Sequence, residues 1–199
     1  MFHVKHEGWT PEKLSSAQVR SLDSYEGLLA EHAVPKGMVA VSDAGHFRER
    51  HVLDSLRAVP HILTGPLAVL DLGSGAGLPG IPVAIARPDL TIALVEPRQA
   101  RAAFLELVAE RLHLANVTVL PRPVEELTIE PVDVVLARGF RGPSMTWIAA
   151  RDLLSPRGEL IYWGGTTFRD DQLPADARVV AIGPPALESG GPIVIMTRQ

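Results

Sequence analysis

Three features of the sequence predict an α/β protein with a mainly parallel, seven-stranded sheet, an antiparallel last strand and an N-terminal helical cap. From Leu67 onward, short apolar runs alternate with helical patterns, which is typical of parallel strands joined by helices. The first 65 residues carry helical patterns only. The two apolar runs nearest the C-terminus are too close together for a crossover helix, so we expect them to pair as a hairpin.

The composition is that of one globular body. Of 199 residues, 46% are apolar, which is ample for a core. We divide the chain into a cap, residues 1–65, and an α/β domain, residues 66–199. No apolar run approaches the length of a membrane span, and Met1–His6 lacks the core of a signal peptide. We therefore expect a cytoplasmic protein, and we expect it to be a monomer.

Charge and cysteine content exclude several classes of function. A net charge of −4 argues against strong nonspecific binding of nucleic acid, although a local basic patch can coexist with it. The chain has no cysteine, which excludes disulfides, thiolate metal sites and every mechanism with a cysteine nucleophile. We expect no metal.

Two helices are predicted in the cap. The first begins at Thr10–Pro11 and ends near His32, and the second begins at Ser42–Asp43 and stops at Pro60. The second helix carries four basic or titratable side chains: Arg48, Arg50, His51 and Arg57. They form either a solvated helix face or a patch that faces phosphate.

The elements of the α/β domain follow in order. Strands are predicted at residues 67–72, 91–95, 117–120, 132–137, 159–163, 178–182 and 193–196. Helices are predicted at residues 81–86, 98–112 and 145–154. In an open sheet of this kind the ligand lies at the carboxyl ends of the strands, so the loops after the first four strands should converge.

The turn after the first strand is predicted to bind a cofactor. The run Gly73–Gly80 is rich in glycine, which allows close approach of a ligand to the backbone, and a helix begins behind it. Gly75–Gly80 fits G-x-G-x-x-G, so a dinucleotide and S-adenosylmethionine (SAM) are both candidates. Asp71 favours SAM, because a carboxylate suits its ammonium and sulfonium charges and repels a pyrophosphate. Gly73, Gly75 and Gly77 are the expected backbone contacts.

Three further strand ends carry candidate residues. Glu96 closes the second strand, where its carboxylate can accept both ribose hydroxyls; the alternative is a surface acid beside Arg98. Val124 and Glu125 follow the third strand, where an adenine is expected near an acid, although Glu125 equally suits solvent. Arg138 follows the fourth strand and should point toward the methionine end of the cofactor or the substrate.

Several motifs resemble those of the small-subunit ribosomal RNA guanine-N7 methyltransferases, the glucose-inhibited division protein B family. Asp71–Pro82 resembles the cofactor loop of that family, Arg50–Ser55 its R-H-x-x-D-S helix and Ala137–Phe140 its S-R-A-F element. The resemblance implies a Rossmann-like SAM-dependent methyltransferase fold behind a helical cap, with S-adenosylhomocysteine as product and ribosomal RNA or the small ribosomal subunit as partner. It places these residues at cofactor-binding positions: Gly73, Leu78, Val124, Glu125 and Arg138.

Three elements depart from the pattern of that family. The lysine of its L-K-G or I-K-G element is replaced by Gly164, the N-L-T element is not recognisable around Met38–Val41, and Gly190–Pro192 replaces basic residues before the last strand. Missing basic side chains are missing RNA contacts. A methyltransferase of a small molecule or another RNA, and a SAM-binding protein with weakened catalysis, therefore stay open as alternatives.

The chemistry of methyl transfer narrows the choice of acceptor. Carbon-5 of a pyrimidine needs a cysteine adduct, and exocyclic amines commonly need an N/D-P-P-Y/F loop, where Ala137–Phe140 stands here. N7 of guanine has a free lone pair and needs only a donor to O6 and an aromatic stack. Arg138 with Phe140 or Trp163 would supply these, unless the aromatic rings serve only core packing. The residues expected on the substrate side are Arg50, His51, Arg141 and Trp163.

Overall fold

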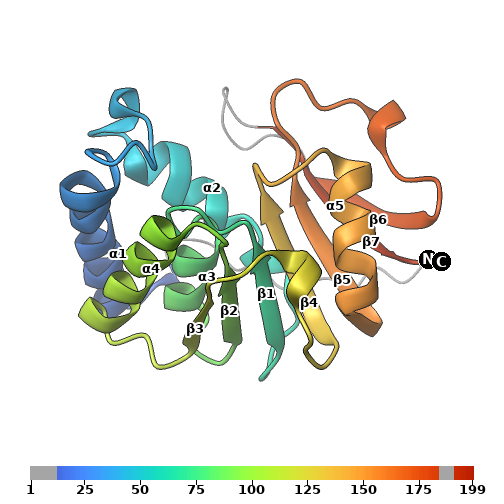
Figure 1. Cartoon of the computed structure of the whole chain (residues 1–199), viewed down its shortest axis with the longest axis horizontal. Helices are drawn as coiled ribbons and strands as arrows, with labels where there is room; N and C mark the ends of the chain where they lie inside the picture. The colour runs from blue at the N-terminus through green and yellow to red at the C-terminus, as the bar shows by residue number, and fades with distance from the viewer. Residues whose placement is uncertain (1–12, 184–190) are drawn as a thin grey trace.

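The computed structural model describes residues 13–183 and 191–199 and is built around one seven-stranded sheet (Figure 1). The strand order is β3-β2-β1-β4-β5-β7-β6. The strands are β1 Ala68–Leu72, β2 Thr91–Val95, β3 Val117–Leu120, β4 Val132–Arg138, β5 Leu154–Trp163, β6 Ala177–Gly183 and β7 Ile193–Arg198. β1 to β5 are parallel, and β7 is antiparallel to both β5 and β6. The predicted fold class and terminal hairpin are confirmed.

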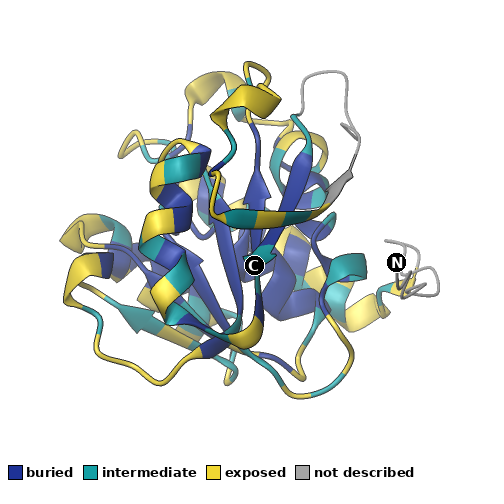
Figure 2. Cartoon of the chain, turned by 90° about the vertical axis from the view of Figure 1, so that its right-hand side faces the viewer, coloured by how far each residue is buried: buried dark blue, intermediate teal, exposed yellow. Residues whose placement is uncertain are grey.

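Helices cover both faces of the sheet, because alternate strand residues point to opposite sides. In β4, Val134 and Leu136 pack in the same cluster as α3 (Gly80–Ala86) and α4 (Gln99–Arg111). Val135 and Ala137 pack in a second cluster with α5 (Pro143–Ala150). Figure 2 shows the strands buried between helices with exposed outer faces.

Three predicted boundaries around α5 were wrong. The helix begins at Pro143 rather than Met145 and ends at Ala150, and a short turn, η7 (Arg151–Leu153), follows it. β5 then begins at Leu154, ahead of the predicted start at Glu159. Leu154 is 1% exposed, so its burial beside β4 extends the strand.

The first cap helix is α1 (Ser16–Leu28), continued by a π turn, η2 (Leu29–Ala33). The predicted start at Thr10–Pro11 lies outside the described residues. Ser15 caps α1 in a reciprocal pair with Gln18, whose backbone N–H donates to Ser15 Oγ at 3.3 Å and whose Oε1 accepts from the Ser15 N–H at 2.9 Å. The Gln18 amide also donates to the carbonyls of Ile85 and Ala86, which joins the cap to the end of α3.

The predicted second cap helix is broken into short pieces: η3 Val41–Asp43, η4 Arg48–Val52, α2 Leu53–Leu56 and η5 Val59–His61. Gly45 has φ +86°, which ends the first piece. The Asp43 carboxylate then reaches Arg50 and His51, each at 2.9 Å. In a straight helix these residues would be separated by about 10 Å along the axis, so the fold-back requires the break.

The cap and the sheet share a hydrophobic core. Leu22, Leu29, Val52 and Leu56 are at most 1% exposed and belong to the same cluster as Ile81 of α3. Of the helices in the described ranges, none is long and apolar enough to cross a bilayer.

Candidate active site

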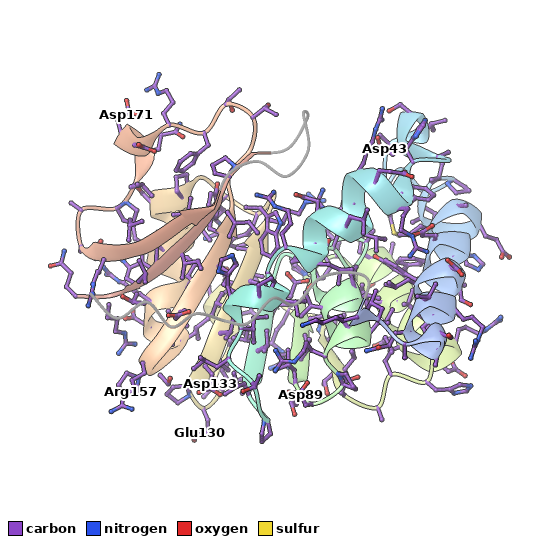
Figure 3. All side chains as sticks on the ribbon, turned by 180° about the vertical axis from the view of Figure 1, so that it is seen from behind. Asp43, Asp89, Glu130, Asp133, Arg157 and Asp171 are labelled. Carbon is purple, nitrogen blue, oxygen red and sulfur yellow. The ribbon has the colours of Figure 1, made fainter. Side chains whose placement is uncertain are left out.

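A pocket of about 320 Å³ lies where the loop after β1, the end of β4 and the cap meet. Its lining includes Gly73–Ala76 and Leu78 from the loop, Arg138 at the end of β4 with Gly139 after it, and Asp43 and His51 from the cap. Figure 3 shows Asp43 at the opposite end of the molecule from Asp89 and Asp133, which lie at the starts of β2 and β4. The pocket is therefore at the carboxyl ends of the strands, as expected.

The glycine loop is shaped as a cradle. Gly73, Gly75 and Gly77 have φ values of +68°, +59° and +97°. A Cβ on Gly73 would lie 2.6 Å from the ring of Phe140, and one on Gly77 would lie 2.6 Å from Ile81. A Cβ on Gly75 would meet nothing closer than 3.8 Å, so the loop is open on that side.

The backbone of this loop favours SAM over a dinucleotide. Most of its N–H groups are bonded within the protein: Gly73 and Ser74 to Val95 O, Gly75 to Glu96 Oε2, and Gly77 and Leu78 to Ser74 O. A pyrophosphate would need these donors free. An acid takes the Gly75 N–H instead, so the chemistry of the cradle fits a cationic cofactor.

Asp71 lies beneath the cradle rather than in the pocket wall. It is 0% exposed, and its Oδ2 accepts the Gly80 N–H at 3.1 Å. Burial raises the pKa of this carboxyl to about 7, against the opposing effects of Ser74 and Gly80. Asp71 therefore supports the start of α3 through Gly80.

Glu96 fixes the loop to the end of β2. It is 3% exposed; Oε2 accepts from Gly75 N–H at 3.0 Å and Oε1 from Arg98 N–H at 2.9 Å. The guanidinium of Arg101 lies 3.9 Å from the Glu96 carboxylate. Glu96 is a buried acid, not a surface acid.

Arg138 is held by the cap. Its Nε lies 3.2 Å from Asp54 Oδ2, and its terminal nitrogen donates to His51 Nδ1 at 3.0 Å and to the carbonyl of Arg50 at 3.3 Å. A guanidinium only donates, so His51 Nδ1 accepts; the ring proton is then on Nε2, which donates to Asp43 at 2.9 Å. Burial lowers the pKa of Arg138, with Asp54 opposing the shift.

Tyr25 of α1 supports the loop from the other side. It is 0% exposed and its hydroxyl donates to the carbonyl of Ala76 at 2.7 Å. Burial raises the pKa of Tyr25 well above its usual value, so the hydroxyl stays a donor. Tyr25, Asp43 and Asp54 were not among the residues expected at the site; for Asp54 the signal was its place in the R-H-x-x-D-S motif.

A second pocket of about 290 Å³ shares Arg138 and Gly139 with the first. Its remaining lining comes from Arg50, Asp54, the end of β5 through Thr166, and Gly191. The two pockets are therefore neighbours on either side of Arg138.

Comparison with known proteins agrees with this geometry. The family model described as rRNA small subunit methyltransferase G matches residues 18–183. Ribosomal RNA small subunit methyltransferase G of Corynebacterium diphtheriae is 40% identical over 180 residues, which cover 85% of this chain and 78% of that protein. The protein of the same name from Aromatoleum aromaticum is 34% identical over 196 residues, with 94% and 92% covered.

This chain belongs to the rRNA small subunit methyltransferase G family. The resemblance found in the sequence is confirmed, and the chain is a SAM-dependent methyltransferase.

Solved structures show the same fold. A mutant of MtNAS in complex with S-adenosylmethionine has a TM-score of 0.64 and 17% identity, covering 92% of this chain and 76% of that one. A putative SAM-dependent methyltransferase from Methanococcus maripaludis has a TM-score of 0.60 and 13% identity, covering 96% and 98%.

Some residues that were predicted to bind the cofactor lie apart from the 320 Å³ pocket. Val124 is 8% exposed in the core, and neither it nor Glu125 is among the residues that line the 320 Å³ pocket. Glu125 pairs with Arg141 at 2.5 Å, which lowers the pKa of the carboxyl. The Arg141 guanidinium lies 4.5 Å from the ring centre of Phe140, so these three side chains form one group beside the loop.

Trp163 and the basic cap residues are engaged inside the protein. Trp163 is 5% exposed and its indole N–H donates to the carbonyl of Asp54 at 3.0 Å, which favours the packing role. The acids that pair with the basic side chains are Asp23 and Glu26 for Arg48, Asp43 for Arg50 and His51, and Asp54 for Arg57. Each of these basic side chains therefore has an acidic partner within the protein.

Gly164, at the position of the family lysine, packs against Phe168. A Cβ there would lie 2.9 Å from Phe168 Cγ. Within the described residues, no group of three or more His, Asp or Glu side chains is arranged to hold a metal.

Proposed function

We propose that this methyltransferase modifies N7 of a guanine in 16S ribosomal RNA, with Arg138 between the cofactor and the acceptor base. The observation that carries this assignment of the site is that Arg138 lines both pockets. A donor on a shared wall can hold a base so that its reacting atom faces the cofactor. The names of the relatives support ribosomal RNA as the acceptor.

We propose that the loop and the strand ends around it hold the cofactor. Bound SAM supplies an electrophilic methyl group for in-line displacement. Glu96 keeps acceptor capacity on both oxygens for ribose hydroxyls. Met38 and Val39 of the cap line the same pocket and limit the access of water. The proposed cofactor residues are Asp71 (from beneath), Gly73, Gly75, Gly77, Leu78, Glu96, Val124, Glu125 and Arg138.

On the acceptor side, the proposed catalytic residues are Arg138 and Phe140. The N7 lone pair needs no general base, so the protein has only to orient the base. Arg138 donates to O6, and the half-buried ring of Phe140 lies beside Gly73 and offers the stacking surface. Arg50 and Arg141 contribute positive charge toward RNA, and His51 acts through Arg138.

We also propose an oligomeric state, a cellular location and a division into domains. We propose a monomer that acts in the cytoplasm on ribosomal RNA or the small subunit, with residues 1–65 as a cap and residues 66–199 as the methyltransferase domain. The cap residues Asp43 and His51 in the pocket lining support a direct role of the cap in the site.

The test uses small ribosomal subunits from a strain that lacks the enzyme. Incubation with methyl-labelled SAM should label 16S ribosomal RNA, and chemical cleavage at N7-methylguanosine should map the label to one guanine. Label at another atom, or SAM binding without transfer, would overturn the proposal.

A second candidate is an acceptor other than 16S guanine. The observation in its favour is Phe168, which fills the space beside Gly164, the position that corresponds to the lysine of the motif that the sequence resembles. The same labelling experiment with total RNA and a small-molecule extract separates the two candidates.

A further inference from the structure

The second pocket contains a charged pair beside the cofactor site. Asp54 is 7% exposed and lines only the 290 Å³ pocket, whereas Arg138 lines both pockets. The order across the site is therefore Asp54, then Arg138, then the cofactor pocket.

Asp54 is held rigidly and retains room to accept. Its Oδ1 accepts from Arg57 at 2.7 Å, its Oδ2 lies 3.2 Å from Arg138 Nε, and its carbonyl accepts from the Trp163 indole. A carboxylate has about four acceptor positions, and within the part of the chain that the structure describes two of them are occupied. The pair thus offers the pocket an acceptor beside a donor.

The edge of a guanine presents hydrogen-bonding groups that match the acceptor and donor of this pair. N1–H donates, O6 accepts and N7 accepts, in that order around the ring. We propose that Asp54 accepts the N1–H of the target guanine while Arg138 donates to O6, which turns N7 toward the cofactor pocket. This inference rests on the proposed function and adds the group that selects the base.

The same pair rejects adenine. Adenine has an amino donor where guanine has O6, and a bare acceptor at N1, so the donor would face Arg138 and the acceptor would face Asp54. Both contacts are unfavourable, which gives selection by repulsion as well as attraction.

The first experiment compares wild type with Asp54→Asn. The amide keeps the size of the side chain and can accept from Arg138, but it then presents an N–H to the guanine N1–H. We expect kcat/KM for undermethylated small subunits to fall by about tenfold or more while the affinity for S-adenosylhomocysteine is unchanged; the Tm should fall, because Arg57 and Arg138 both lose a charged partner. The control is Asp133→Asn, at the far end of β4, where the carboxylate accepts from the Ala68 N–H at 2.9 Å; its activity should not change.

The second experiment leaves the protein intact. Small subunits are rebuilt with inosine or 1-methylguanosine at the target position. Inosine keeps N1–H, O6 and N7 and should be methylated within a few-fold of the guanosine rate. 1-Methylguanosine keeps N7 but lacks N1–H, and its rate should fall by about tenfold or more.

The outcomes separate this inference from the proposed function. Normal transfer to 1-methylguanosine, or full activity of Asp54→Asn, would overturn the role of Asp54 and leave the guanine-N7 activity standing. Failure of wild type to methylate any guanine of the small subunit would overturn both. If Asp54→Asn loses its fold or its affinity for S-adenosylhomocysteine, the 1-methylguanosine result with wild type decides.

Discussion

At the scale of single residues, Arg138 joins the chemistry of the site to the stability of the fold. Its place after an apolar strand predicted a role in transfer or cofactor placement more than in folding. The ion pair with Asp54, at 3.2 Å between side chains 20% and 9% exposed, adds a structural role. The first prediction follows from it.

Replacing Arg138 by alanine should lower the Tm by several degrees. Breaking a buried ion pair costs about 3–5 kcal/mol, and the lower end applies because Asp54 keeps Arg57. Thermal unfolding measures the change. Arg141→Ala is the control, since its partner Glu125 is 58% exposed and little stability should be lost. A Tm of Arg138→Ala within a degree or two of wild type would restrict Arg138 to transfer and cofactor placement.

Asp71 should make stability depend on pH. Its pKa is about 7 in the folded protein against an ordinary 3.8, so between pH 4 and pH 7 the folded state keeps a proton that the unfolded chain has released. Its contribution is therefore fully present below pH 4 and lost as pH rises to 7, by up to about 1.4 kcal/mol per pH unit. Urea unfolding of wild type and Asp71→Asn at pH 5, 6, 7 and 8 measures this. A difference between the two that is constant with pH would rule out the shift.

At the scale of elements, α1 acts on the cofactor loop through Tyr25. Tyr25→Phe leaves the buried carbonyl of Ala76 without its donor, which costs about 1–3 kcal/mol and loosens the cradle. We expect weaker binding of S-adenosylhomocysteine by calorimetry. Tyr162→Phe is the matched control, because that hydroxyl donates to the carbonyl of Arg141 and does not touch the loop. Equal affinities for the two variants would exclude a role of α1 in binding.

In the turn after β5, Phe168 leaves little room for a side chain at position 164. Gly164→Lys forces Phe168 to move, because the new Cβ lies 2.9 Å from Cγ, and such overpacking costs about 1–3 kcal/mol. We expect a lower Tm and no gain in methylation, with Tm recovered when Phe168→Ala is added. Gly165→Lys is the control, since a Cβ there meets nothing within 4 Å. Equal stability of the two lysine variants would show that Phe168 yields freely.

At the scale of the whole molecule, the strands and the glycine loop could be predicted from the sequence, because their conformation depends on residues that are close together in the chain. An apolar run such as Val132–Ala137 predicts a buried strand, and a glycine cluster such as Gly73–Gly80 predicts a turn. The partners of Arg138 were not readable, since His51 is 87 residues away and reaches it only after Asp43 folds back past Gly45. The contact of Tyr25 with Ala76 joins residues 51 positions apart and could not be predicted for the same reason.

The shared core predicts that cap and sheet unfold together. Leu22→Ala in α1, where the side chain is 0% exposed, should lower a single Tm seen by both circular dichroism and tryptophan fluorescence. Val19→Ala, at a position 38% exposed, should change it little. Two separate transitions would mean that the cap folds independently.

The contacts between the cap and the C-terminal part of the chain also affect when the site can form during synthesis. Arg57 donates to the carbonyl of Gly191, 134 residues later, and Trp163 donates to Asp54, 109 residues earlier. A chain made from its N-terminus exposes the apolar side of the cap long before these partners leave the ribosome. Closing such long loops is slow, so this wall of the 290 Å³ pocket is completed only after Gly191 has emerged, and the apolar side of the nascent cap stays exposed to aggregation until then.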